Sequence, residues 1–127
     1  MYEYREELEK SVVISLFGDW TDNPFEIDDI KKVIENLDVS LFTHKGRQLV
    51  VRAVKKMNTL DEYKNSLPTI DMVLAWVELS VKKQVFKVVE ATIFDCMEKT
   101  PLCLDNLNNT IELLKQYKLK DELRSIE

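Results

Sequence analysis

The sequence predicts an all-α fold, a single domain spanning residues 1–127 in which five to six antiparallel helices form a bundle or stacked helix pairs. The chain of 127 residues contains two glycines and three prolines, so few positions interrupt helices. Apolar residues recur every three or four positions along most of the chain, which is typical of amphipathic helices. A chain of this length buries about two-thirds of its unfolded surface in one core.

The first two helices are expected over residues 3–17 and from residue 24 to Leu37. Gly18 closes the first helix, whose outer face carries four acids, Glu3, Glu6, Glu7 and Glu9. Asn23 precedes a proline and is followed three residues later by Glu26, an arrangement that caps a helix N-terminus. The second helix then buries its isoleucines, which stand at positions 27, 30 and 34.

A third helix is expected to begin at Ser40 or Thr43 and to end at Met57. After it, Thr59 and Glu62 have the spacing of a capping box, and Pro68 stops whatever helix they open. Residues 60–66 are therefore predicted to form a short connector helix.

Residues 70–98 keep their apolar positions in helical phase, which is long for a globular helix. We expect either one helix of about seven turns or two helices that break near residues 82–84. Asp105 can cap a last helix. Leu119, Leu123 and Ile126 fall out of the phase of that helix, which predicts a kink or a separate last turn.

Charge is distributed unevenly along the chain, whose net charge is −5. Residues 1–38 contain eleven acids and four bases, giving −7, whereas residues 39–58 contain five bases and no acid, giving +5. The remaining 69 residues carry twelve acids and nine bases, giving −3. An acidic third beside a basic segment indicates either internal pairing or two faces for different partners.

The basic segment and one aromatic residue form the candidate partner-binding surface. On a helical wheel, one cationic stripe adjoins the apolar face of the third helix; it consists of Lys45, Arg52, Lys55 and Lys56. Trp20 lies in a polar turn, where it is either offered to a partner or folded back over the first helix junction. Tryptophan is enriched at the centres of protein interfaces.

Nothing in the sequence predicts catalysis, a cofactor or a metal. His44 is the only histidine, and Ser40 lies four residues before it, but no glycine-lined oxyanion site accompanies the pair. Nucleotide-binding and metal-binding motifs are absent. With one histidine, Cys96 and Cys103 do not complete a zinc shell without carboxylates, and we expect both as small buried apolar side chains.

The sequence contains no apolar run of the roughly 20 residues that a membrane span requires, and its first residues lack the pattern of a signal peptide. These features predict no membrane partner. They also predict residence in the cytoplasm or another reducing intracellular compartment.

The segment from Thr43 to Trp76 resembles part of the helical N-terminal domain of transcription elongation factors. The matching features are a threonine, a glycine followed by a basic residue, a valine, paired lysines and a downstream tryptophan, at Thr43, Gly46, Arg47, Val50, Lys55, Lys56 and Trp76. The match stops at residue 76 and departs at an insert around Pro68. The resemblance implies a module that docks short disordered peptides of other nuclear factors.

The sequence favours a non-enzymatic helical protein that acts by binding another protein. One alternative is an acidic stoichiometric inhibitor or immunity-type protein that masks a basic site on its target with its first two helices. A further alternative is nucleic-acid contact through the basic stripe of residues 45–56. A homodimer is also open, through the apolar residues Phe42, Leu102 and Leu104.

Overall fold

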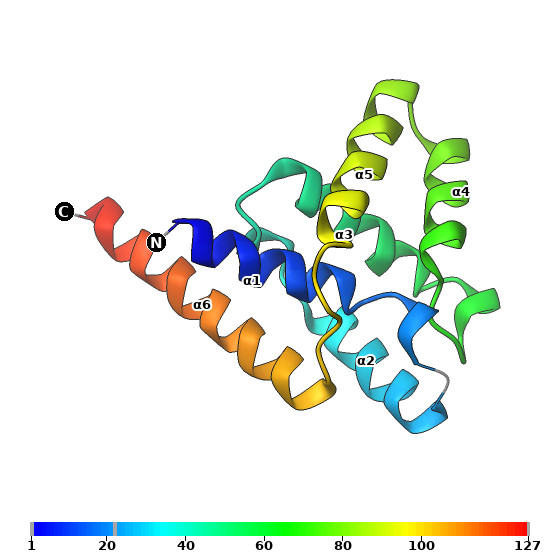
Figure 1. The fold of residues 1–127 in the computed structure, drawn as a ribbon, viewed down its shortest axis with the longest axis horizontal. Coiled ribbons are helices and arrows are strands. Elements are labelled where there is room, and N and C mark those ends of the chain that lie inside the picture. The colour runs from blue at the N-terminus through cyan, green and yellow to red at the C-terminus, as the bar shows by residue number, and fades with distance from the viewer. Residues whose placement is uncertain (1, 22, 127) are drawn as a thin grey trace.

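The computed structural model describes residues 2–21 and 23–126, with side chains from residue 4 onward. Within them it contains six α-helices, three 3-10 turns and no strand (Figure 1). The all-α prediction is confirmed. The helices are α1 (Tyr2–Ile14), α2 (Pro24–Asn36), α3 (Lys45–Met57), α4 (Ile70–Ser80), α5 (Lys83–Cys96) and α6 (Leu104–Ile126), and the turns are η1 (Gly18–Trp20), η2 (Val39–Leu41) and η3 (Asp61–Tyr63).

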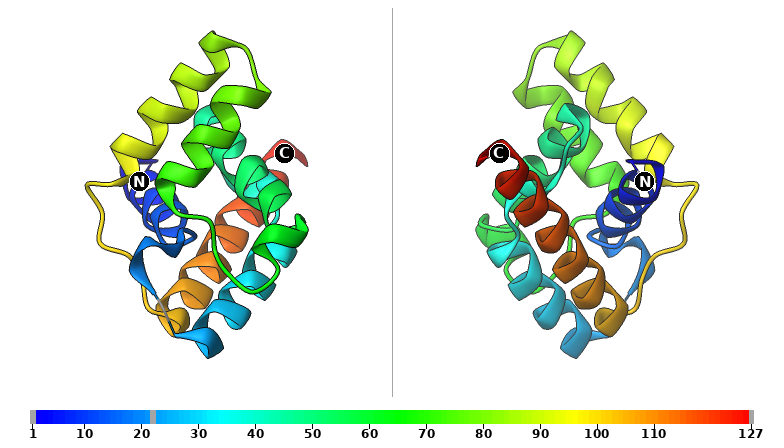
Figure 2. Two further views of the ribbon diagram at one scale, coloured as in Figure 1. Left: turned by 90° about the vertical axis from the view of Figure 1, so that its right-hand side faces the viewer. Right: turned by 90° about the vertical axis from the view of Figure 1, so that its left-hand side faces the viewer.

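The helices pack around α1, which contacts α3, α5 and α6. Helices α4 and α5 form a hairpin that projects from one side, whereas α2 and α6 lie next to each other on the opposite side (Figures 1 and 2). The completely buried side chains include Phe17 and Ile14 at the end of α1, Ile34 of α2 and Leu114 of α6. One continuous apolar core therefore joins all of these elements.

The observed caps agree with the sequence at α2 and differ at α3. The side chain of Asn23 accepts a hydrogen bond from the backbone N–H of Phe25 at 3.0 Å, as predicted. Helix α3 instead begins after His44, whose ring Nδ1 accepts from the backbone N–H of Gly46 at 3.1 Å. The prediction of a cap at Ser40 or Thr43 was wrong. It considered only hydroxyl side chains, whereas a histidine ring nitrogen can also accept a hydrogen bond from an N-terminal N–H.

Two expectations about helix length are corrected and one open alternative is resolved. The connector predicted over residues 60–66 is helical only as the single turn η3. The long segment from Ile70 is two helices, with the break at residues 81–82. Helix α6 runs unbroken for 23 residues, because the residues that leave its apolar phase, Leu119, Leu123 and Ile126, remain exposed and need no contact with the core.

Gly18 is required by a close approach of the chain rather than by a left-handed helix cap. Helix α1 ends at Ile14, and no glycine in the described part of the chain has a positive φ. The backbone N–H of Gly18 donates to Pro68 O at 2.9 Å, and a β-carbon at Gly18 would lie 2.2 Å from Leu67 O. The segment before α4 thus packs directly onto the end of α1.

No described helix is both long and apolar enough to cross a membrane.

Candidate functional site

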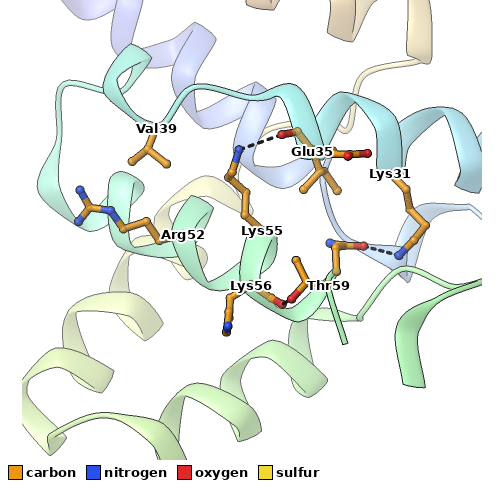
Figure 3. Close-up of a pocket in the computed structure, with 9 residues that line it drawn as sticks. Lys31, Glu35, Val39, Arg52, Lys55, Lys56 and Thr59 are labelled. Carbon is orange, nitrogen blue, oxygen red and sulfur yellow. Dashed lines mark hydrogen bonds between the residues drawn. The ribbon is translucent and has the colours of Figure 1, made fainter. Parts of the chain in front are cut away.

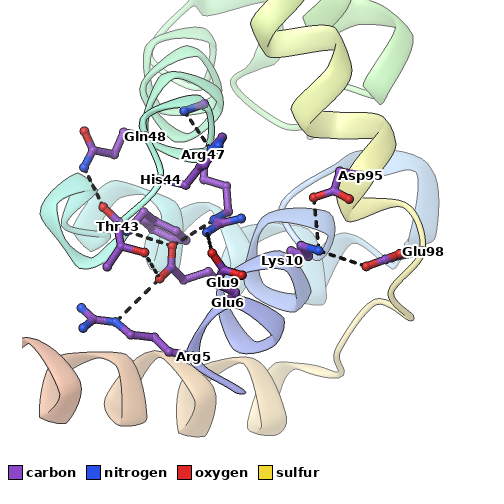
Figure 4. A network of polar contacts seen from close by, with 12 residues as sticks. Arg5, Glu6, Glu9, Lys10, Thr43, His44, Arg47, Gln48, Asp95 and Glu98 are labelled. Carbon is purple, nitrogen blue, oxygen red and sulfur yellow. Dashed lines mark hydrogen bonds and ion pairs between the residues drawn. The ribbon is translucent and has the colours of Figure 1, made fainter. Parts of the chain in front are cut away.

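A carboxylate lies buried between three helices. Glu9 of α1 is 0% exposed, and its Oε1 accepts from Arg47 Nε of α3 at 3.0 Å (Figure 4). Thr43 donates to the same carboxylate twice, through its backbone N–H at 2.9 Å and its hydroxyl at 2.8 Å. Arg5 Nε lies 3.7 Å from Glu9 Oε2. Because the buried charge is paired and hydrogen-bonded, its desolvation is compensated.

Two further acids, Glu6 and Asp121, lie at the edge of this cluster, which then contains two cations and three carboxylates. Arg5 Nη1 donates to Asp121 Oδ2 of α6 at 2.5 Å, and Arg47 Nη2 lies 3.7 Å from Glu6 Oε1. The guanidinium of Arg5 also lies 5.5 Å from the ring centre of Tyr117, within the range of a cation–π contact. The cluster thereby holds α1, α3 and α6 together.

These contacts correct two sequence expectations about charge. Glu9 was placed on the outer face of the first helix, whereas the structure buries it completely. Arg47 was counted in the surplus of five bases, but it is 3% exposed and paired with Glu9. The basic surface near α3 therefore comes from the other four cations of the segment.

Three of the predicted partner-binding residues line one groove between α2 and α3. The groove has a volume of about 540 Å³, and its residues are Lys31, Ile34, Glu35, Val39, Arg52, Lys55, Lys56, Asn58 and Thr59 (Figure 3). Volumes of about 300–1,000 Å³ are usual for small-ligand pockets. The sequence placed Arg52, Lys55 and Lys56 on one helix face, and the structure sets that face against α2.

Lys31 is the groove cation with no N–H group left for a ligand. Its Nζ donates to Asn58 Oδ1 at 2.5 Å, Tyr63 O at 2.5 Å and Ser66 O at 2.9 Å, which uses all three of its N–H groups. Burial lowers the pKa of the Lys31 ammonium, and the nearby charge of Asp28 opposes this shift. Lys31 therefore anchors the loop after α3 to α2.

Lys55 uses part of its hydrogen-bonding capacity within the protein. Its Nζ donates to Leu37 O at 2.6 Å and to Glu35 O at 3.2 Å. These carbonyls end α2, where a cation offsets the negative pole of the helix. Two of its three N–H groups are thus engaged, and one remains for a ligand.

Arg52 and Lys56 are exposed, and no hydrogen bond or ion pair within the described chain involves their charged ends. In Figure 3 the side chain of Arg52 extends beside Val39, at the end of the groove away from Lys31. Glu35 on the α2 wall is also exposed, and it is the one acid among the lining residues. The accessible charges are therefore two full cations, part of Lys55 and one carboxylate.

The structure separates the other two predicted residues from this groove. Lys45 is exposed at the first position of α3, two turns before Arg52. Trp20 is 47% exposed in η1, and its indole N–H donates to Ile14 O at 2.7 Å. Trp20 lines a different cavity with Cys103 and Leu104, so the five predicted residues occupy three places.

The polar residues near His44 serve structural contacts. The hydroxyl of Ser40 donates to Asp38 Oδ1 at 2.7 Å and accepts from Lys118 Nζ at 2.5 Å. His44 is an exposed helix cap, and no hydrogen bond joins it to Ser40 in the described structure. The hydroxyl and the backbone N–H of Ser40 donate to Asp38, and together with Lys118 they lower the pKa of the Asp38 carboxyl to about 2.

The two cysteines differ from each other, which corrects the expectation that both are buried. Cys96 ends α5 inside the core, and burial raises the pKa of its thiol to about 12. Cys103 is free and exposed in the loop before α6, where the chain leaves the core.

The apolar residues considered for a dimer contact are also mostly covered. Phe42 is 1% exposed and belongs to the core, while Leu102 and Leu104 are half-buried against it.

Sequence reasoning missed Lys31 and Glu35, which stand four residues apart on α2. Their spacing indicates a shared helix face, but it does not reveal which element covers that face. The oxygen atoms that accept from Lys31 belong to Asn58, Tyr63 and Ser66, which follow it in the sequence by 27, 32 and 35 positions. Tertiary packing brings them together.

Comparisons with protein-family profiles, curated proteins and solved structures found no match to this chain.

Proposed function

We propose that this protein is a non-enzymatic helical protein that binds an acidic segment of another protein in the α2–α3 groove. The observation that carries the proposal is the pair of exposed, unengaged cations Arg52 and Lys56 at the rim of a groove with apolar residues in its lining. Complementary charge steers association and sets specificity.

The composition of the groove suits a peptide better than a lone ion. Val39, which is half-buried, contributes apolar surface, and the aliphatic stems of the lysines extend it. An apolar side chain of the partner would cover this surface while flanking carboxylates reach the cations. The four cationic residues lie on two helices whose positions are fixed by Lys31 and Lys55, so the ordering that accompanies binding is confined to side chains such as Arg52 and Lys56.

The experiment compares the wild type with the double variant Arg52→Glu/Lys56→Glu. A displayed library of randomised short peptides is selected on the wild-type protein, and the affinity of selected peptides is measured by fluorescence anisotropy. The matched control is Lys82→Glu/Lys83→Glu, which changes two exposed cations outside the groove by the same total charge.

We expect acidic peptides to be selected and the groove variant to lose at least about tenfold in affinity, equivalent to about 1.4 kcal/mol. The control is expected to keep its affinity within about twofold at physiological salt, because distant exposed charges are screened. Equal losses in both variants, or selection of peptides without acids, would contradict the proposal.

The acidic alternative remains a second candidate because the net charge is −5. Three of the acids first considered are paired within the chain, Glu6 and Glu9 with Arg47 and Glu7 with Lys99, while the side chain of Glu3 lies outside the described part. Asp28 and Asp29 of α2 are exposed. Selection of basic peptides whose binding is lost in Asp28→Lys/Asp29→Lys would favour this alternative.

Nucleic-acid contact through the same basic residues predicts a different outcome. Because each neutralised phosphate releases counterions, duplex DNA or RNA would bind with a steep dependence on salt. Titrations at low and physiological salt would detect it. Nucleic-acid binding that is lost in Arg52→Glu/Lys56→Glu, together with a selection that yields no acidic peptide, would favour nucleic acid over an acidic peptide.

A further inference from the structure

The two walls of the α2–α3 groove differ in charge. The α3 wall presents Arg52, Lys55 and Lys56 and contains no acid among the lining residues. The α2 wall presents Lys31 and Glu35, but the three N–H groups of Lys31 are already engaged. The unengaged charged group of the α2 wall is therefore the carboxylate of Glu35.

The carboxylate of Glu35 is exposed and is not engaged by another residue of the described chain, so a ligand can reach it. Its backbone oxygen accepts from Lys55 Nζ at 3.2 Å, but no described hydrogen bond or ion pair involves its carboxylate. Figure 3 places Glu35 between Lys55 and Lys31, and Arg52 towards the opposite end of the groove. The groove thus has two free cations towards its Arg52 end, whereas its Glu35 end has a free carboxylate beside the ammonium groups of Lys31 and Lys55, whose N–H groups are engaged wholly or in part by carbonyl oxygens.

We propose that Glu35 is a specificity-determining residue that selects a peptide with mixed charge. Resting on the proposed function of the groove, this inference adds that the bound segment carries carboxylates at the Arg52 end and a basic residue beside Glu35. A carboxylate placed next to Glu35 is repelled, and a basic residue placed there is attracted. Such a repulsive element discriminates between partners and fixes the direction of the bound chain.

The experiment is a lysine and glutamate scan of an acidic peptide selected on the wild-type protein. Each position of the peptide is replaced in turn by lysine and by glutamate, and affinities are measured on the wild type, on Glu35→Gln and on Glu35→Lys. Glu78→Lys, an exposed position of α4, is the matched control for the change of charge. Thermal unfolding establishes that each variant is folded.

One end of the peptide is expected to tolerate or prefer lysine on the wild type, by about twofold to fivefold for an exposed pair. Glu35→Gln removes this preference, and Glu35→Lys reverses it in favour of an acid. At the other end, lysine weakens binding to all of these proteins, because it faces Arg52 and Lys56. Glu78→Lys gives the wild-type pattern.

A lysine scan unchanged by Glu35→Lys, with binding still lost in Arg52→Glu/Lys56→Glu, would overturn the role of Glu35 and leave the groove as the binding site. Peptides whose affinity is insensitive to Arg52→Glu/Lys56→Glu would instead overturn the proposed function, and the role of Glu35 with it. If Glu35→Lys and Glu78→Lys changed the peptide affinities equally, the effect would come from the net charge of the protein. That result would overturn the role of Glu35.

Discussion

Glu9 and Arg47 form an ion pair of 3.0 Å between α1 and α3, and neither side chain is more than 4% exposed. The pair is separated by 38 residues in the sequence, so it fixes one helix against another rather than a helix against itself. Thr43 completes the site by donating two hydrogen bonds to Glu9. Removal of one charge from such a site leaves the other with only a longer contact of 3.7 Å, Arg47 to Glu6 or Glu9 to Arg5, in a medium of low polarity.

Replacement of Glu9 by glutamine is therefore expected to lower the free energy of unfolding by about 3–5 kcal/mol, because it leaves Arg47 and Arg5 as buried cations without their shared counter-charge. Urea denaturation followed by circular dichroism measures this change. Glu6→Gln is the matched control, since Glu6 is half exposed and lies 3.7 Å from Arg47; we expect a loss of at most about 1 kcal/mol. Equal losses in the two variants would contradict a special role for the buried carboxylate.

Gly46 on α3 faces Thr92 on α5, and a β-carbon at Gly46 would lie 2.2 Å from Thr92 Oγ1. Gly46→Ala is expected to destabilise the protein by about 1–3 kcal/mol, as overpacking of a core does. Thr92→Ala removes the clashing atom, so the double variant should recover part of the loss. A double-mutant cycle of unfolding free energies measures the coupling, and additive effects would show that this contact does not limit the packing of α3 on α5.

The two thiols are expected to react at very different rates. Cys103 is exposed, whereas Cys96 is buried and has its pKa raised to about 12 by that burial. Since the thiolate is the reactive form, a disulfide reagent at neutral pH should label one cysteine in the folded protein and two after denaturation. Cys103→Ser should abolish the fast reaction. Rapid labelling of two thiols in the folded protein would contradict the packing of α5.

Stability is expected to fall as pH falls from about 4 to about 2, in part because of Asp38. The hydrogen bonds from Ser40, together with Lys118, lower the pKa of Asp38 to about 2 in the folded protein. The unfolded chain therefore binds this proton first, so the stabilisation is complete above the unfolded pKa of about 4 and is lost towards the folded value. Asp38→Asn should flatten the pH dependence of the unfolding free energy in this range, and an unchanged slope would argue against the shift.

The helices of this protein were largely predictable because their signals are local. Asn23 caps α2 through its own side chain, and the apolar residues that recur along α3 and α5 are buried in the core. The break at residues 81–82 was left open because no glycine or proline marks it. Helix α6 was mispredicted because exposed leucines at its end were assumed to require burial.

The candidate site was only partly predictable because it depends on tertiary partners. The spacing of Arg52, Lys55 and Lys56 placed them on one face, but no local pattern showed that Lys31 from α2 would join them with all its N–H groups occupied. Arg47 is the opposite case. Its sequence neighbours suggested a surface cation, whereas Glu9, 38 positions earlier, draws it into the interior.

The contact of Arg5 with Asp121 joins residues that are 116 positions apart, and it places the first turn of α1 alongside the last third of α6 (Figure 1). Helices α1 and α6, which begin and end the described chain, therefore pack against each other. A short artificial linker bridging the two ends, with a new opening at the turn between α4 and α5, would make this most distant pairing a local one. Such a circular permutant would keep every helix intact while making the pairing of α4 with α5 the distant one, so its folding rate would show which of the two pairings limits folding.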